Sequence, residues 1–372
     1  MKRFIKDIIL FMLPIFCVII VLGIFYWVSK DIGELQSIEK NVQAQRENEN
    51  IIVGLGYNEQ TAYYKLLNAN YYQAKIIALG TSRVMQFKGD YFDDRFYNCG
   101  GAVNGNYDEY VNFLKNLEYI PEMILVGLDS WVFNDEWNKS CAVYHDFKII
   151  QEIDRDSKVV LKAIISDWIN GKWTFKELDT YAHNIGFNGC VKDNGFMCDG
   201  SYYYGDIYRN PQASTDYQFA DTLKRISDGR SRFEWGEHID EDTVKQLENL
   251  LLYCNEKNIS AVGFITPFAP SIYKEMETGG HYGYLGEIEP MCEMLFEKYG
   301  FEFYNFASGE YLGLTDDYFV DGFHGSEVLY GYIVKEMINN NSSIKRYVNQ
   351  EQLDNLLKNA FSTLVFENPD KR

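Results

Sequence analysis

The sequence predicts an α/β fold, with a doubly wound and mostly parallel sheet in a three-layer sandwich behind an N-terminal transmembrane helix. Two observations lead to this prediction. Short apolar runs that stop at turn residues alternate with helical stretches, and one long uncharged run lies near the N-terminus. Strands that alternate with helices are typical of a parallel sheet covered on both faces. Because such sheets carry their sites at the carboxyl ends of the strands, chemistry is expected there.

The apolar run covers residues 8–28 (IILFMLPIFCVIIVLGIFYWV) and contains no charged side chain. A helix of that length rises about 30 Å, which is enough to cross the hydrocarbon core of a bilayer. Basic residues precede the run and acidic residues follow it: Lys2, Arg3 and Lys6, then Asp31 and Glu34. The positive-inside rule then puts residues 1–7 in the cytoplasm and the main domain outside the cell membrane. No small-x-small cleavage site follows the run, which favours an uncleaved single-pass anchor over a signal peptide.

Four short apolar runs are expected to form buried strands of one sheet. They lie at residues 75–79, 123–128, 261–265 and 301–306. Helical patterns lie between them, at about 106–117, 240–257 and 284–299. The second of these helices begins with Asp240, Glu241 and Asp242, whose negative charges suit the positive end of the helix dipole.

Composition divides the rest of the chain. Residues 29–74 are polar and then rich in tyrosine, and they predict a stalk or helical linker. Residues 75–340 contain all the expected strands and predict the main domain. Residues 131–235 interrupt its rhythm and hold most of the tryptophans, so they predict an aromatic-rich insertion or lid. Residues 341–372 predict a C-terminal helix and a charged tail.

The charge and the cysteines exclude several classes of function. A net charge of −19 disfavours contact with phosphate backbones, so no nucleic-acid partner is expected, whereas a neutral polyol polymer is compatible. The seven cysteines include no C-x-x-C pair and the five histidines show no paired ligand spacing. Neither a metal site nor a cofactor is therefore predicted. Cys190 and Cys198 are close enough in sequence to bridge a hairpin, and the sequence does not decide whether they do.

A candidate nucleophile follows the first strand, in Gly80-Thr81-Ser82-Arg83. Glycine lets the chain turn where a side chain would clash. Ser82 would then stand at the carboxyl end of the strand, where its own backbone amide could help to bind an oxyanion. The alternative is an ordinary Ser or Thr that caps the next helix. The α/β-hydrolase elbow does not apply, because Gly-x-Ser-x-Gly is absent.

A candidate base lies far along the chain, in Asp321-Gly322-Phe323-His324. Residues three apart on one turn can place both side chains on the same side. The carboxylate of Asp321 can then fix the tautomer of His324, whose other ring nitrogen is free to take a serine proton. The alternative is an Asp that caps a helix beside a surface histidine.

Together, Gly-Thr-Ser early and Asp-x-x-His late resemble the SGNH (GDSL-like) hydrolases. In that family the nucleophile follows the first strand and Asp-x-x-His lies near the end of the domain. The resemblance covers about residues 75–340 and implies a flavodoxin-like three-layer catalytic domain with Ser82, Asp321 and His324 as its triad. Thr81 replaces the usual Asp of Gly-Asp-Ser, so the chain is a divergent member.

The resemblance also implies an oxyanion hole. The second family block supplies a glycine amide, and residues 97–105 (YNCGGAVNG) fall where it should be. We expect Gly101 in this role, with Gly105 next. The third block normally reads Gly-x-Asn-Asp, but residues 127–131 read Gly-Leu-Asp-Ser-Trp. The Asn donor is missing, and Ser130 is the remaining candidate for it.

Gly-Thr-Ser-Arg and Leu-Asp-Ser-Trp behind a single span resemble a subgroup that includes teichoic-acid D-alanyl transfer and alginate-type O-acetylation proteins. There, a multispanning membrane-bound O-acyltransferase partner brings an acyl group across the bilayer and the SGNH protein places it on a polymer. The resemblance implies a serine O-acyltransferase that moves an acyl group, expected to be acetyl, onto a cell-surface polysaccharide through an acyl-serine. An esterase or deacetylase, and an inactive polymer-binding scaffold, are the alternatives.

Four residues beside these motifs are candidates for substrate binding, and three of them have a structural alternative. Arg83 could bind an anionic group of donor or polymer, or form an internal ion pair. Asp129 and Ser130 lie at the end of a strand, where an Asx turn explains an Asp equally well. Trp131 could stack on a sugar ring or pack in the core.

Overall fold

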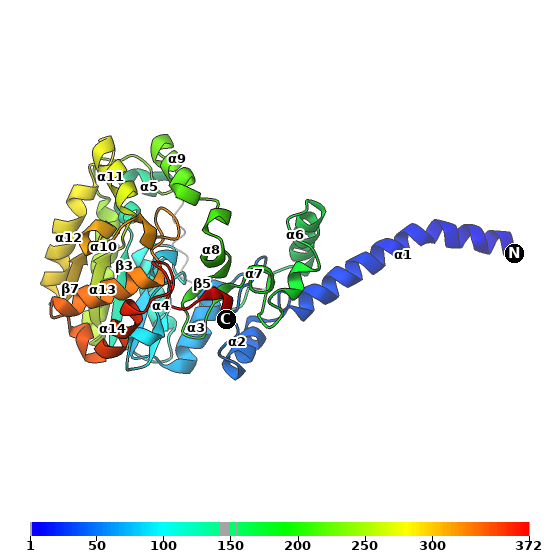
Figure 1. Ribbon diagram of the computed structural model, residues 1–372, viewed down its shortest axis with the longest axis horizontal. Coiled ribbons are helices and arrows are strands. Elements are labelled where there is room, and N and C mark those ends of the chain that lie inside the picture. The colour runs from blue at the N-terminus through cyan, green and yellow to red at the C-terminus, as the bar shows by residue number, and fades with distance from the viewer. Residues whose placement is uncertain (1, 141–148, 154, 372) are drawn as a thin grey trace. The chain divides into compact units, whose positions relative to one another are not determined.

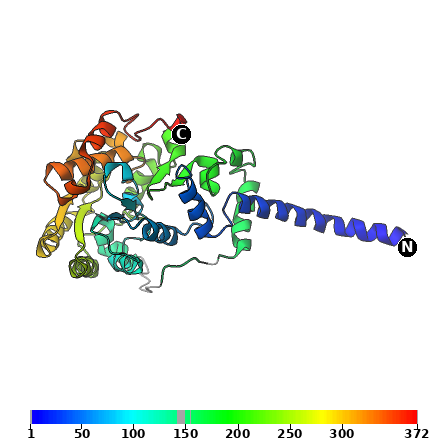
Figure 2. The same cartoon turned by 90° about the horizontal axis from the view of Figure 1, so that it is seen from below.

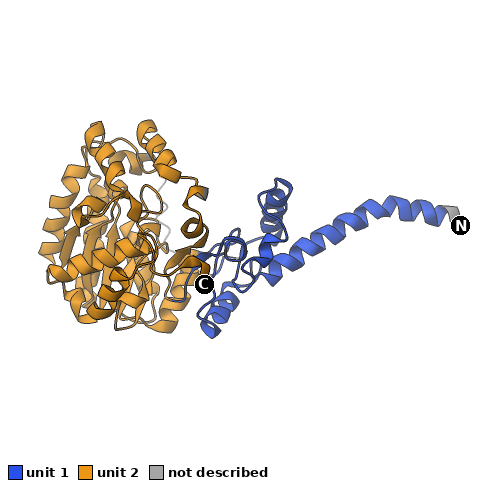
Figure 3. Cartoon of the chain, viewed as in Figure 1, with its two compact units in different colours: residues 1–60, 152–198 blue, residues 61–151, 199–372 orange. Residues whose placement is uncertain are grey.

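The computed structural model describes residues 2–140, 149–153 and 155–371, which form two compact units (Figure 1 and Figure 2). Unit 1 comprises residues 1–60 and 152–198, and unit 2 comprises residues 61–151 and 199–372 (Figure 3). This division differs from the predicted one. The middle of the predicted 131–235 insertion belongs to unit 1, and the predicted 29–74 stalk is divided at residue 60.

Unit 1 begins with the long helix α1 (Lys2–Asp31), which contains the predicted span. Among the described residues, α1 is the one helix long and apolar enough to cross a membrane. Its most apolar window has a mean hydropathy of 3.2, and 6% of that window is buried. A signal sequence near the N-terminus can also satisfy this criterion of length and composition.

The rest of unit 1 packs around the C-terminal end of α1. It contains helices α2 (Ile38–Glu47), α6 (Ser157–Ile169) and α7 (Phe187–Lys192) and strand β4 (Asn194–Phe196). The fully buried carboxylate of Glu34 accepts hydrogen bonds from the backbone amides of Gly56, Tyr57, Asn58 and Phe187. Because one carboxylate holds four amides from two distant segments, residues 29–60 are packed structure and not the solvated stalk that their polar composition predicts.

Unit 2 is built on a five-stranded sheet in the order β2-β1-β3-β6-β7, with every neighbouring pair parallel. Its strands are β1 (Ile76–Leu79), β2 (Phe96–Asn98), β3 (Met123–Leu128), β6 (Ser260–Ile265) and β7 (Glu302–Asn305). All residues of β1 and β3 are buried, as expected for strands covered on both faces. The predicted parallel sheet is confirmed, and the four predicted strands agree with the observed ones to within about a residue at each end.

Helices cover both faces of this sheet. Phe264 and Phe303 point to opposite faces, because Phe264 lies opposite Tyr304 in the register of β6 with β7. Phe303 contacts Phe296 of α12 (Leu285–Lys298), with ring centroids 5.6 Å apart. Phe264 contacts Tyr330 of α13 (Glu327–Asn339), with centroids 6.4 Å apart. The sheet therefore lies between two helical layers.

The remaining helices of unit 2 complete the layers and the loops above the sheet. They are α3 (Thr61–Tyr72), α4 (Tyr107–Asn116), α5 (Asp135–Ser140), α8 (Gly205–Arg209), α9 (Ala220–Asp228), α10 (Glu241–Lys257), α11 (Pro270–Gly279) and α14 (Gln350–Lys358), with the short strand β5 (Tyr202–Tyr204). Asp240 caps α10 by accepting from the amide of Thr243 at 2.7 Å, which agrees with the acidic start of the predicted helix.

The strand order locates the site. The chain goes from β1 to β2 on one side and then crosses to β3 on the other side of β1. In an open parallel sheet, the connections diverge at such a point and leave a crevice at the carboxyl ends of the strands. Ser82 follows β1 directly, so the candidate nucleophile lies at this switch point.

Candidate active site

The turn after β1 presents Ser82 without using its side chain for capping. A Cβ at Gly80 would lie 2.7 Å from Val84, so a larger residue would not fit in this turn. Thr81 caps the following turn, since its Oγ1 accepts from the amide of Arg83 at 3.3 Å. The same hydroxyl donates to Asp129 at 2.6 Å. Thr81, and not Ser82, is therefore the residue that caps the turn, and the hydroxyl of Ser82 is available for chemistry.

The structure brings Ser82, His324 and Asp321 into one line. Ser82 Oγ lies 2.8 Å from His324 Nε2, and His324 Nδ1 lies 2.7 Å from Asp321 Oδ2. An ionised carboxylate only accepts hydrogen bonds, so Nδ1 carries the ring proton and Nε2 accepts from the serine hydroxyl. This is the order of groups in which a serine proton can pass to a histidine that a carboxylate orients.

Asp321 is held in its ionised form. Burial opposes its ionisation, but the charge and hydrogen bond of His324 favour it, as do the backbone amides of Phe323 and His324. These amides donate to Asp321 Oδ1 at 2.9 and 2.7 Å. The pKa of Asp321 therefore lies below its ordinary value. The side chains of His324 and Asp321 are 15% and 21% exposed, so the site is open at one side.

Arg83 joins the nucleophile turn to the histidine loop. Its side chain is 1% exposed, and its Nε donates to the carbonyl oxygen of Phe323 at 2.8 Å. A second guanidinium nitrogen donates to the carbonyls of Thr266 and Pro267, which follow β6. Because Arg83 is next to Ser82 and Phe323 is next to His324, this one side chain fixes the spacing of nucleophile and base.

The other predicted substrate-binding residues also lie in the interior. Asp129 accepts from the hydroxyls of Thr81 and Thr266 and lies 3.6 Å from the guanidinium of Arg83. Trp131 is 3% exposed, and its ring lies 5.1 Å from the Arg83 guanidinium. The hydroxyl of Ser130 is buried with no hydrogen-bond partner in the described part of the chain. The structural alternatives therefore apply to Arg83, which forms an internal ion pair, and to Trp131, which packs in the core. The Asx turn expected at Asp129 is not formed, because its side chain makes no cap hydrogen bond and contacts Thr81, Thr266 and Arg83 instead. All three residues offer little surface to a polymer.

The two glycines predicted for an oxyanion hole differ in whether their amides are already hydrogen-bonded. The amide of Gly101 donates to the carbonyl of Gly80 at 2.9 Å and is therefore already used. Gly105 has a φ of +101°, and a Cβ there would lie 3.7 Å from the side chain of Thr81, beside the nucleophile turn. The amides of Ser82 and Gly105 donate to no acceptor within residues that the structure describes. Of the two predicted glycines, Gly105 is therefore the one whose amide is not already bonded to another group in the described residues.

Two residues near the triad were missed at the level of sequence. The ring of Tyr204 lies 6.5 Å from that of His324, and burial raises the pKa of Tyr204, which keeps its hydroxyl neutral. The guanidinium of Arg232 lies 5.9 Å from the ring of Phe323 and 5.6 Å from that of Trp131, on a backbone with φ of +79°. The run Gly-Arg-Ser-Arg at 229–232, basic in an acidic chain, was the available signal for Arg232.

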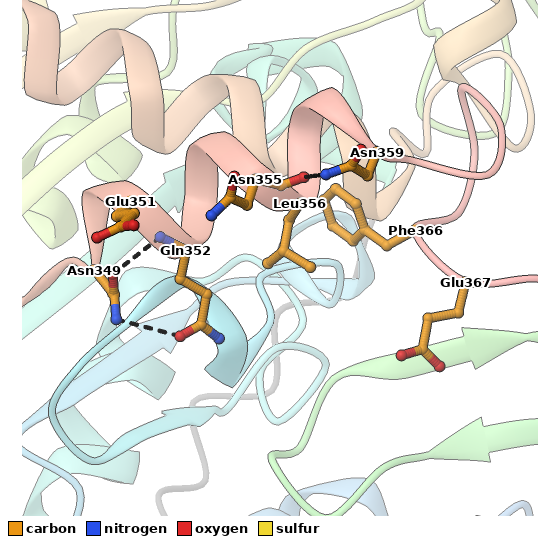
Figure 4. A pocket seen from close by; sticks show the side chains of 8 residues that line it. All are labelled: Asn349, Glu351, Gln352, Asn355, Leu356, Asn359, Phe366 and Glu367. Atoms are coloured by element: carbon orange, nitrogen blue, oxygen red, sulfur yellow. Dashed lines mark hydrogen bonds between the residues drawn. The ribbon is translucent and has the colours of Figure 1, made fainter.

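A hollow lies along α14 and shares no residue with the triad (Figure 4). Its volume is about 500 Å³. Amide side chains dominate its lining, together with one aromatic ring and two carboxylates: Asn349, Gln352, Asn355, Asn359, Leu356, Phe366, Glu351 and Glu367. Several of these amides are hydrogen-bonded within the helix and its cap, so the hollow contains no proton-transfer line like that of Ser82.

Comparisons with known proteins add no family to this geometry. A scan against protein-family models and a search of curated proteins both found no match. Among the described residues, no group of three or more His, Cys, Asp or Glu side chains could hold a metal ion. The described cysteines are free thiols, including Cys190 and Cys198. What remains is a serine, a histidine and a carboxylate at the carboxyl edge of a parallel sheet.

Proposed function

We propose that this chain is a membrane-anchored, extracytoplasmic serine O-acyltransferase of the SGNH (GDSL-like) type. It moves an acyl group, expected to be acetyl, onto a cell-surface polysaccharide or related polymer. The observation that carries the proposal is the hydrogen-bonded line from Ser82 through His324 to Asp321. Two segments 242 residues apart in the chain meet in this line, and neither hydrogen bond is needed to cap a helix.

The first half of the reaction forms an acyl-serine. His324 Nε2 takes the proton of Ser82 as Oγ attacks the carbonyl carbon of an ester or thioester donor. The amides of Ser82 and Gly105 hold the negative oxygen of the tetrahedral intermediate. When the intermediate collapses, His324 returns the proton to the leaving alcohol or thiol, and the acyl group stays on Ser82.

The second half transfers the acyl group. His324 takes the proton of a polymer hydroxyl, whose oxygen attacks the acyl-serine carbonyl. Collapse of the second intermediate releases the acylated polymer, and the proton returns to Ser82. Asp321 stays ionised throughout and stabilises the protonated ring.

Of the three departures from the family pattern, at Thr81, Asp129 and Ser130, the first two compensate each other. The Asp of Gly-Asp-Ser is replaced by Thr81, and the Asn of Gly-x-Asn-Asp by Asp129. The Thr81 hydroxyl donates directly to Asp129, so two carboxylates at these positions would be in contact. The loss of one carboxylate beside the gain of the other supports a rearranged active site over a decayed one, and argues against the inactive scaffold.

The proposed location favours transfer over hydrolysis. We propose that α1 anchors the chain with residues 1–7 in the cytoplasm, so that a multispanning O-acyltransferase partner can deliver the acyl group across the bilayer. An esterase or deacetylase is the second candidate, because the partly exposed His324 and Asp321 leave the site open to water.

A serine-directed fluorophosphonate probe tests the nucleophile. We expect the full chain in detergent to be labelled, and the Ser82→Ala variant to be unlabelled. Ser271→Ala, at an exposed serine of the same unit, serves as the matched control and should be labelled like the unmodified chain. A folded but unlabelled chain would support the scaffold. Polymer acylation in cells lacking the protein then separates the remaining candidates, since a loss of acyl groups indicates transfer and a gain indicates removal.

A further inference from the structure

Helix α6 of unit 1 leaves two large aliphatic side chains uncovered, among exposed Lys158, Lys162 and Ser166. Val160 and Ile164 are buried, whereas the opposite face carries Val159 and Ile169, which are 67% and 70% exposed. The neighbouring aromatic side chains of Trp168 and Phe175 are also exposed. With 13 residues, α6 is too short to cross a bilayer, which takes about 20. Exposed aliphatic side chains interspersed with lysines on a short helix are the pattern of a helix that lies in a membrane–water interface.

The packing of α6 fixes its level relative to α1. Phe25 of α1 lies 5.3 Å from the ring of Trp168, 5.3 Å from that of Phe175 and 6.1 Å from that of Trp173. Phe25 belongs to the last turn of the apolar run, which ends at Val28. A span that leaves the bilayer at Val28 therefore holds α6 at the outer membrane–water interface. Both views show α6 running crosswise to α1, as a helix in the membrane plane would (Figure 1 and Figure 2).

The side chains at this level have the composition of an interface. Tyr26 and Trp27, which follow Phe25 in α1, are exposed, as are Trp168 and Phe175. Aromatic side chains are enriched where headgroups meet the acyl chains. Residues 157–176 contain four lysines and one aspartate, although the whole chain has a net charge of −19. All four lysines are exposed: Lys158, Lys162, Lys172 and Lys176. Basic side chains beside an apolar face attract anionic lipid headgroups.

We propose that α6 and residues 170–176 form a second membrane contact, which lies in the headgroup region of the outer leaflet and prefers anionic phospholipid. This inference rests on the membrane anchoring proposed for α1 and is independent of the acyl-transfer chemistry. Unit 1 is then fixed to the bilayer surface at two points. A flexible stalk at residues 29–74 would instead have left the rest of the chain free to move away from the bilayer.

Site-directed spin labelling of the full chain tests the depth of α6. The chain is reconstituted into vesicles of phosphatidylcholine and phosphatidylglycerol, and a nitroxide is attached to Ile169→Cys or Val159→Cys in a Cys17→Ser background. Collisions with oxygen, which concentrates in lipid, are compared with collisions with a water-soluble nickel chelate. We expect a several-fold excess of oxygen collisions at both positions. The reverse is expected at Gln43→Cys, an exposed polar position on α2 of the same unit.

Three outcomes would overturn the inference. Nickel collisions at position 169 as frequent as those at position 43 would mean that α6 faces water. Low collisions with both reagents would mean that a second copy of the chain covers the face. An unchanged depth in vesicles without phosphatidylglycerol would remove the role of the lysines.

A label on the native Cys17 separates this test from the anchoring proposal. Cys17 lies inside the apolar run. If position 17 is protected from nickel while position 169 is not, the inference for α6 fails and the anchor stands. If position 17 also meets nickel, the anchor itself fails. The Cys17→Ser chain without an added cysteine measures background labelling of the other thiols.

Discussion

Arg83 gives the sharpest test of how the two halves of the active site are held together. In Arg83→Leu, the buried Asp129 loses its counter-charge at 3.6 Å, and the carbonyl oxygens of Phe323, Thr266 and Pro267 lose their donor. Removing one partner of a buried ion pair costs about 3–5 kcal/mol, because the other charge is left uncompensated. We therefore expect the free energy of unfolding of unit 2 to fall by about 3–5 kcal/mol, a large part of the stability of a typical domain.

Arg83→Lys is the matched control for this prediction. It retains the charge opposite Asp129 but loses the planar fork that reaches several carbonyls at once. We expect about 1–3 kcal/mol of destabilisation, the usual cost of leaving buried carbonyls without donors. Fluorophosphonate labelling of Ser82 should be slow in both folded variants, because the loop of His324 is no longer tied to the nucleophile turn.

Urea pulse proteolysis of the detergent-solubilised chain measures the unfolding free energy, and the labelling rate measures the site. If Arg83→Leu lowers the free energy of unfolding by less than about 1 kcal/mol, the Arg83–Asp129 pair contributes no more than an exposed ion pair, and the reasoning is refuted. Normal labelling in a folded Arg83→Leu protein would equally refute the positioning role.

Three further predictions follow from the same geometry. Asp321→Asn should slow labelling of Ser82 by about 10⁴-fold, because the ring of His324 is no longer held in the productive tautomer. The folded pKa of Asp321 is depressed, so its contribution to stability is present above its ordinary pKa of 3.8 and is lost as pH falls through the lower folded value. Acid unfolding of the unmodified chain, compared with that of Asp321→Asn, measures this contribution. Thr81→Asp should destabilise unit 2 by bringing two carboxylates together, and adding Asp129→Asn should restore stability; a lack of rescue in thermal melts would contradict the compensation. Gly105→Ala and Gly101→Ala both put a methyl group on a backbone of positive φ, but only the former should slow labelling beyond its effect on stability; equal rates in the two variants would reject Gly105 as a donor.

Local patterns were sufficient for the elements that depend on near neighbours. The strands at 123–128 and 261–265 were predicted because a strand buried on both faces is apolar throughout. Helix α10 was predicted from its acidic start and its apolar spacing. The contact of Asp321 with His324 was predictable because residues three apart share one side of a turn. The polar composition of residues 29–60 predicted a solvated stalk, but the buried carboxylate of Glu34 holds this segment in packed structure through its hydrogen bonds to backbone amides.

The apolar helix, the alternation of strands and helices, and the two short motifs are all readable from the sequence, because each depends on side chains close together in the chain. Contacts between distant segments bring Ser82 to His324 and bury Arg83 between their loops. Within the described residues, they also bond the amide of Gly101 to Gly80 and leave that of Gly105 unbonded. The same kind of contact packs α6 on α1. These outcomes depend on which distant segments the sheet brings to one edge and which polar groups they satisfy there, and no local pattern encodes that.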